Sequence, residues 1–145
     1  MSIPQAGSIY LWRYLENVRN YSGFHLTCDS AGCSTLRAAL NNEAGYPYVT
    51  VNLASDEKVL KVPNNKGGLA KAIFYKTLVI KVGQSLPGEY MRFKELEGGV
   101  CELKCSVGQA DCILGGVDDI EIGKGDYSVG EIKGQDLTFW WYPNA

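Results

Sequence analysis

Residues 24–40 read FHLTCDSAGCSTLRAAL and join a strand pattern to a helix pattern. From Phe24 to Cys28, apolar and polar side chains alternate, which is the period of a half-buried strand. Asp29 or Ser30 follows, and either side chain is suited to cap the start of a helix. The apolar residues that then recur at helical spacing are Cys33, Leu36 and Leu40. The stretch therefore predicts a strand that leads directly into a helix.

The segment before this unit, residues 8–20, predicts another helix. Ser8 is suited to cap it. Its apolar residues at helical spacing are Leu11, Leu15 and Val18. Three aromatic residues lie among them, namely Tyr10, Trp12 and Tyr14. The chain is therefore expected to begin helix, strand, helix.

From Tyr46 onward the apolar period changes to two, which predicts strands. The runs are YVTVNL (48–53), KVLKV (58–62), AIFYKTLVIKV (72–82), MRFKEL (91–96) and VCELKCSV (100–107). The run at 72–82 is apolar on both faces, so it predicts a central strand. Because Gly98 and Gly99 lie between the last two runs, these runs are expected to form a hairpin.

A later helix is predicted at residues 109–122, although Gly115 and Gly116 inside it each cost roughly 1 kcal/mol relative to Ala. Residues 126–132 and 136–142 then predict a closing hairpin. The whole pattern predicts one α+β domain over residues 1–145. It is expected to contain two N-terminal helices, a mostly antiparallel sheet of about six strands and one later helix.

The chain shows no sign of export or of a membrane segment. Its start, MSIPQAGSIY, lacks the basic residues and apolar core of a secretory signal, and no segment approaches the roughly 20 apolar residues that cross a bilayer. The five cysteines, an odd number, fit reduced thiols better than a disulfide framework. We therefore expect a cytoplasmic protein without a membrane partner.

Charge and aromatic side chains gather near the C-terminus. Residues 105–145 hold two basic and seven acidic side chains, so their field disfavours nucleic acid and favours a basic protein partner. In a strand at 136–142, Phe139 and Trp141 would lie on one face, which can fill the core, and Trp140 and Tyr142 on the opposite face. That outward face needs a cover, either from the aromatic first segment or from another molecule.

These features predict a partner-binding surface. Trp140 and Tyr142 are its candidate anchors, because Trp and Tyr are frequent hot spots of protein interfaces. Nearby carboxylates would speed association with a basic partner. They are Asp118, Asp119, Glu121, Asp126 and Glu131. No catalytic residue, cofactor or metal ion is expected.

A thiol enzyme is one alternative class. Cys28 lies before a predicted helix N-terminus, where the helix dipole stabilises a thiolate. A phosphatase-type loop needs an Arg six residues later, but this chain has Ser34 there. A buried core cysteine is therefore the expected role. His25, the only histidine, is expected on the polar surface of its strand.

A metal enzyme is a second alternative class. Cys101, Cys105 and Cys112, with His25, are candidate zinc ligands. Cys101 and Cys105 would lie about 13 Å apart on a strand, which is too far for one zinc ion. The acidic group and the E-x-K pattern of Glu131 and Lys133 match metal-dependent nucleases, yet the local charge repels a nucleic acid substrate. A structural subunit of a larger assembly is a third alternative.

Four stretches are considered together, namely YLWRYLENVRNYSGFHLTCDSAG (10–32), VPNNKGG (62–68), GKGDYSVG (123–130) and LTFWWYP (137–143). In combination they resemble the small cytoplasmic proteins of bacterial toxin-immunity systems. The resemblance implies an α+β inhibitor that binds one toxin, often a basic nuclease, through an acidic and aromatic surface. It carries over no catalytic residue.

Overall fold

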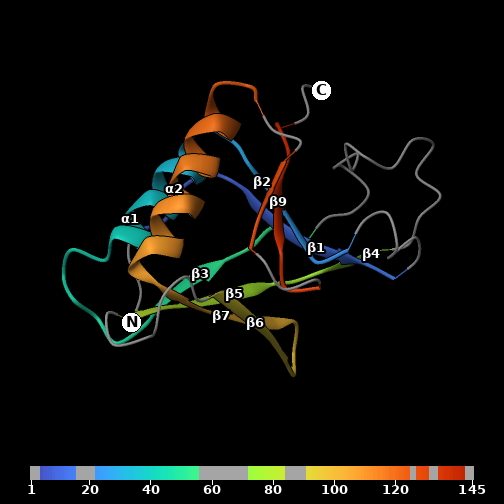
Figure 1. The fold of residues 1–145 in the computed structure, drawn as a ribbon, viewed down its shortest axis with the longest axis horizontal. Coiled ribbons are helices and arrows are strands. Elements are labelled where there is room, and N and C mark those ends of the chain that lie inside the picture. Colours follow the sequence, from blue (N-terminus) through green and yellow to red (C-terminus); the bar gives the residue numbers. More distant parts are fainter. Residues whose placement is uncertain are drawn as a thin grey trace.

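The computed structural model describes residues 4–15, 22–55, 72–83, 91–124, 127–130 and 134–142. Within these residues the chain forms nine strands and two helices (Figure 1). The strands are β1 (Ile9–Tyr14), β2 (Phe24–Cys28), β3 (Val49–Asn52), β4 (Ala72–Phe74), β5 (Thr77–Gly83), β6 (Met91–Leu96), β7 (Val100–Ser106), β8 (Tyr127–Val129) and β9 (Leu137–Phe139). The helices are α1 (Ser30–Asn41) and α2 (Val107–Glu121).

The described strands form two sheets. One has five strands in the order β4-β1-β2-β9-β8, and the other has four in the order β3-β5-β7-β6. Neighbouring strands are antiparallel except for two parallel pairs, β2 with β9 and β5 with β7. The β2–β9 pair brings Leu26 opposite Phe139 and so places the end of the described chain beside β2.

The two helices lie side by side and pack against strands of both sheets (Figure 1). The main core lies between these helices and the inner faces of the sheets. Among its fully buried members are Leu11, Leu26, Leu36, Ile80, Leu103, Val117 and Phe139. A second cluster of buried rings contains Tyr10, Trp12, Tyr14, Phe74 and Trp140. None of the described helices is long and apolar enough to cross a membrane.

The predicted strand-to-helix unit at residues 24–40 is confirmed as β2 and α1. Asp29 is the N-cap, and its Oδ1 accepts hydrogen bonds from the backbone N–H groups of Gly32 at 2.7 Å and Ser8 at 3.0 Å. This carboxylate therefore satisfies a helix donor and also holds the chain that enters β1. The apolar residues predicted for the helix, Cys33, Leu36 and Leu40, are all buried.

The predicted first helix is wrong, because residues 9–14 form strand β1. Alternation explains the difference: Ile9 and Leu11 face the main core, while Tyr10, Trp12 and Tyr14 face the second cluster. This period of two is the strand period, and apolar side chains on both faces are buried, aliphatic ones on one face and rings on the other. Leu15, which the helical spacing placed in the core, is 50% exposed.

The predicted central strand at 72–82 is also wrong as a single element. It divides into β4, an edge strand of the five-stranded sheet, and β5, a strand of the four-stranded sheet. At the junction, the Tyr75 N–H donates to the Leu11 carbonyl at 3.0 Å, and the Lys76 carbonyl accepts from the Leu53 N–H at 2.8 Å. The apolar run is continuous because it crosses from one sheet to the other.

The predicted architecture is therefore corrected: the α+β class holds, but the described residues form two sheets and two helices rather than one six-stranded sheet and three helices. Strand YVTVNL appears as β3, and the hairpin at 91–107 as β6 and β7. The closing hairpin appears as β8 and β9. The predicted strand KVLKV lies outside the described residues.

The later helix is confirmed as α2, and its glycine pair has a structural reason. Gly116 is buried, and a methyl group added there would overlap the ring of Phe139 in β9. Gly115 faces open space. Glycine at position 116 lowers the helix propensity of α2, but it allows the helix to approach β9 closely.

Candidate functional site

The start of α1, the end of α2 and the segment after β9 meet at one end of the molecule (Figure 1). Between them lies a pocket of about 400 Å³. It is lined by Cys28, Asp29, Ser30, Ile120, Glu121, Gly123, Trp141 and Tyr142. Its volume falls at the lower end of the range of small-ligand pockets, roughly 300 to 1,000 Å³.

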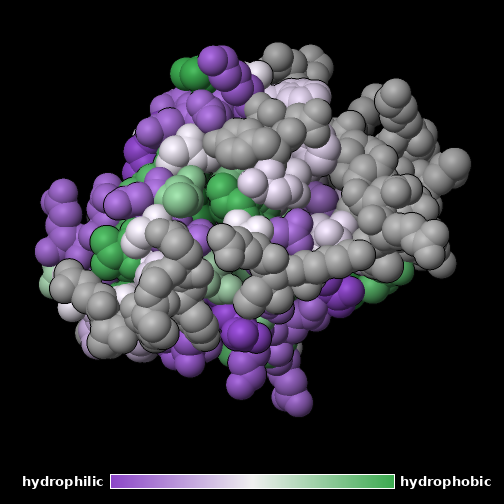
Figure 2. All heavy atoms as spheres, viewed as in Figure 1, coloured by the Kyte–Doolittle hydropathy of each residue, from purple (hydrophilic) through white to green (hydrophobic). Residues whose placement is uncertain are grey.

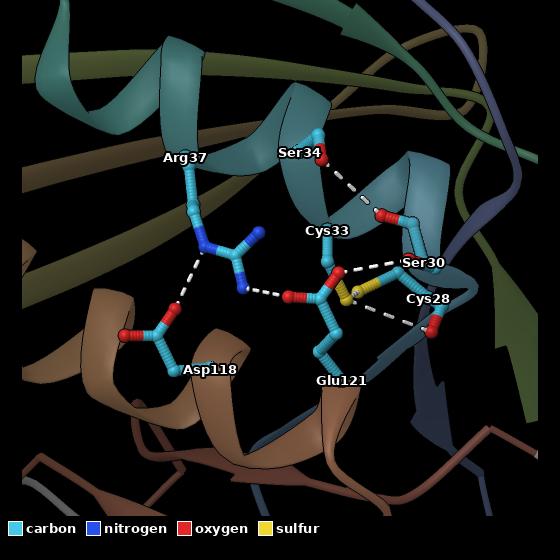
Figure 3. Close-up of polar contacts among 7 residues, drawn as sticks. All are labelled: Cys28, Ser30, Cys33, Ser34, Arg37, Asp118 and Glu121. Carbon is cyan, nitrogen blue, oxygen red and sulfur yellow. Dashed lines mark hydrogen bonds and ion pairs between the residues drawn. The ribbon is translucent and has the colours of Figure 1, made fainter.

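One wall of the pocket is a polar bridge between the two helices (Figure 3). The Ser30 hydroxyl donates to Glu121 Oε2 at 2.8 Å. The guanidinium of Arg37 donates to Asp118 Oδ1 at 2.7 Å and to Glu121 Oε1. The hydrogen bonds from Arg37 and then Ser30 lower the pKa of Glu121. Glu121 is therefore an anion held in one orientation beside the pocket.

A pair of thiols lies behind the same wall (Figure 3). The sulfur atoms of Cys28, the last residue of β2, and Cys33, in the first turn of α1, are 2.8 Å apart. The hydrogen bond between them, followed by burial, raises the pKa of Cys28. The same bond is the largest cause of the lowered pKa of Cys33. The two pKa directions favour Cys33 over Cys28 as the thiol that ionises first, and when protonated the Cys33 thiol can also donate to the Cys28 carbonyl at 3.8 Å.

The segment after β9 places Trp140 inside the protein, which corrects its expected outward position. Trp140 is only 7% exposed, and its Nε1–H donates to Nδ1 of His25 at 2.9 Å. The expected surface position of His25 is likewise corrected, because its side chain is 1% exposed and stacks on Trp12. The aromatic first segment, which forms strand β1, therefore covers the side chains of Trp140 and Tyr142 that were expected to face outward.

Trp141, which sequence alternation assigned to the core face, is the exposed indole. It is 42% exposed and lines the pocket together with the half-buried Tyr142. Alternation failed here because β9 ends at Phe139, and beyond a strand the side chains no longer follow a period of two. Tyr142 packs against Tyr10, with the ring centroids 6.4 Å apart.

Of the predicted carboxylates, the structure brings Glu121 into the pocket and Asp118 to its rim through Arg37. Asp119 is half-buried near the end of α2, where it has interactions of its own. Asp126 and Glu131 lie outside the described residues. The sequence indicated Ser30 only as a possible helix cap and did not indicate Arg37, because their role at the pocket depends on α2 packing beside α1.

The residues considered for zinc are dispersed. Cys101 and Cys105 are buried in β7, while Cys112 is exposed on α2. His25 belongs to the other sheet. No group of three or more His, Cys, Asp or Glu side chains that could hold a metal ion occurs within the part of the chain that the structure describes.

Comparison with known proteins gives no further constraint on this site. No family model matches the sequence, and a search of curated proteins found no match.

Proposed function

We propose that this chain is a protein-binding module, an immunity-like or antitoxin-like inhibitor that neutralises a basic toxin domain by covering its surface. In this proposal it is a bacterial cytoplasmic protein, acts without a cofactor and is not an enzyme. The observation that carries the proposal is the pocket in which the exposed ring of Trp141 lies with Glu121 and Asp29. These groups suit a lysine or arginine side chain of a partner.

The physical argument is that two attractions act on the same cation. An indole face attracts an ammonium or guanidinium group, by about 0.5–1 kcal/mol at an exposed site and more when water is excluded. A carboxylate held in place, such as that of Glu121, adds a charge-assisted hydrogen bond. A phosphate or other anion would be repelled by the same carboxylates, which favours a protein over nucleic acid.

The end of the molecule that holds the pocket carries a modest excess of negative charge. Around the start of α1 and the end of α2 the described acidic residues are Asp29, Asp118, Asp119 and Glu121. The described cations there are Arg37 and Lys124, and Arg37 is paired within the protein. Hydrophilic residues cover much of the surface over the two helices (Figure 2). The carboxylates therefore contribute mainly to association rate, and the aromatic side chains to retention.

The test compares the intact chain with Trp141→Ala as affinity baits in lysate of the organism that encodes the chain. A protein rich in Lys and Arg should be retained by the intact chain, and Trp141→Ala should weaken its binding by about tenfold or more, the size of an interface hot spot. The purified partner should then lose its own activity when the intact chain is added, because the proposed mode of action is occlusion.

Tyr48→Ala is the matched control. Tyr48 is 40% exposed, close to the value for Trp141, and lies past the far end of α1, away from the pocket. It should leave retention unchanged. Equal retention by Trp141→Ala and Tyr48→Ala would exclude the pocket as the binding site. A retained partner that keeps its full activity when bound would exclude inhibition.

A further inference from the structure

A hydrogen-bonded thiol pair links the end of β2 to the first turn of α1, and the binding proposal does not use it. Cys28 Sγ and Cys33 Sγ are 2.8 Å apart, and both side chains are at most 1% exposed. A disulfide has its sulfurs about 2.0 Å apart, so the two atoms need to approach by less than about 1 Å to bond. The fold has therefore already brought the two sulfurs together.

The surroundings distinguish the two sulfurs. Cys33 belongs to the first turn of α1, where its backbone N–H donates to the Asp29 carbonyl at 2.8 Å, and the N-terminal end of a helix favours an anion. The hydrogen bond with Cys28 lowers the pKa of Cys33 most, and Arg37, one turn further along α1, also lowers it, whereas burial, Glu121 and Asp29 raise it. The position of Cys33 in the first turn of the helix and its hydrogen bond with Cys28 together favour Cys33 as the sulfur that ionises first.

Access to the pair is narrow but present. Cys28 lines the pocket of about 400 Å³ at the start of α1, whereas Cys33 does not, so an oxidant reaches the Cys33 sulfur only past that of Cys28, 2.8 Å away. A water molecule needs only about 30 Å³, and hydrogen peroxide is little larger. Both cysteines are at most 1% exposed, so a small oxidant reaches them more readily than a bulky one. A small peroxide is therefore the oxidant that suits this access.

We propose that Cys28 and Cys33 form a redox-active dithiol that hydrogen peroxide converts into an internal disulfide. The Cys33 thiolate, having released its proton to solvent, attacks one peroxide oxygen. The O–O bond breaks, hydroxide leaves and takes up a proton to form water, and Cys33 becomes a sulfenic acid. Cys28 sulfur then attacks the Cys33 sulfur, and the S–O bond breaks. The departing hydroxide takes the Cys28 proton, so two thiols and one peroxide yield a disulfide and two waters.

The disulfide would tie the end of β2 to the first turn of α1. Cys28, Asp29 and Ser30 are consecutive and all line the pocket, so the oxidised site changes a wall of that pocket. The chemistry itself does not depend on any partner. Failure of the binding proposal would therefore leave the dithiol proposal intact, and the reverse also holds.

The test uses the folded full-length chain treated with graded hydrogen peroxide, quenched with catalase, unfolded in an alkylating reagent and digested with trypsin. Residues 20–37 then form one peptide that holds Cys28 and Cys33 and no other cysteine. The expected product is this peptide lacking two hydrogen atoms and carrying no alkyl group. Dithiothreitol before alkylation should restore two alkyl groups.

The chain supplies its own control. Tryptic residues 105–124 also hold two cysteines, the buried Cys105 and the exposed Cys112. Disulfide should accumulate in peptide 20–37 about tenfold more than in peptide 105–124. A peptide 20–37 that keeps both alkyl groups at doses that oxidise Cys112 would overturn the proposal, and so would a disulfide that forms only in unfolded chain.

Cys28→Ala tests the order of the two steps. With its partner removed, Cys33 should stop at the sulfenic acid and gain a dimedone adduct when the treated protein is unfolded in that reagent. Circular dichroism establishes that the variant is folded. A folded variant without an adduct at Cys33 contradicts Cys33 as the attacking sulfur. If the variant does not fold, the wild-type peptide measurement decides the proposal by itself.

Discussion

The backbone of Gly116 in α2 lies against the ring of Phe139 in β9, with no room for a side chain between them. Phe139 is fully buried, and the contact joins the later helix to the strand that precedes the pocket segment. The position of Trp141 and Tyr142 relative to α2 therefore depends on this close approach.

Gly116→Ala should lower the free energy of unfolding by about 1–3 kcal/mol, the usual cost of overpacking a core. The added methyl group would meet ring atoms of Phe139, and a fully buried ring has little space into which it can shift. Urea denaturation followed by circular dichroism measures the change.

Gly115→Ala is the control for the glycine pair. Gly115 is helical and faces open space, so alanine should raise the free energy of unfolding by up to about 1 kcal/mol through helix propensity alone. Opposite signs for the two variants are the expected result. Stabilisation by both substitutions would show that α2 does not pack closely on β9.

Much of this fold follows from local sequence signals. The unit at 24–40, the β6–β7 hairpin and the closing hairpin all have a period, a cap or a turn inside the segment itself. These elements were predicted because neighbouring residues are sufficient to determine them.

The secondary-structure predictions are wrong where pairing with distant strands determines the structure. Residues 9–14 fit both periods, and the choice is made by pairing of Trp12 with His25 on one side and Phe74 on the other. The run at 72–82 reads as one strand because its apolar pattern does not mark where the chain changes sheets. Neither the pairing of residues 9–14 nor the change of sheet within residues 72–82 is encoded in a short window of sequence.

The pocket was only partly predictable for the same reason. Glu121 and Tyr142 were chosen from charge and composition, and both line it. Cys28, Ser30 and Trp141 meet them through the parallel pairing of β2 with β9, between residues more than a hundred positions apart. No local pattern predicts such a pairing.

Collisional quenching separates the three tryptophans. Trp12 and Trp140 are 0% and 7% exposed, whereas Trp141 is 42% exposed, so acrylamide should reach mainly Trp141. Trp141→Phe should therefore remove most of the quenchable fluorescence, while Trp140→Phe should leave it. Unchanged quenching in Trp141→Phe would place that indole inside the protein and would also weaken the binding proposal.

Trp140→Phe should destabilise the protein by about 1–3 kcal/mol. The indole N–H donates to Nδ1 of His25 in a buried site, and its loss removes the donor to that acceptor. Thermal or urea unfolding measures the effect. Trp141→Phe, an exposed change of the same kind, should stay within about 0.5 kcal/mol. Equal effects of the two substitutions would mean that the His25 contact does not contribute to stability.

Glu121 should make a contribution to stability that disappears in acid. The hydrogen bonds from Arg37 and Ser30 lower its pKa in the folded protein, while the unfolded value is about 4.3. A lowered folded pKa means that the contribution is complete at pH values above about 4.3 and is lost as the pH falls through the folded value. Glu121→Gln should thus be less stable than the intact chain at pH 7 and equally stable in strong acid.

Urea unfolding at both pH values measures this difference for the intact chain and for Glu121→Gln. Asp111→Asn is the matched control, because Asp111 is exposed on α2 and has no hydrogen bond or ion pair with the other described residues. At pH 7 its free energy of unfolding should stay within about 0.5 kcal/mol of that of the intact chain. Since the bridge from Ser30 and Arg37 holds Glu121 at the pocket, a stability gap that persists in acid would mean that this carboxylate is not held as an anion there.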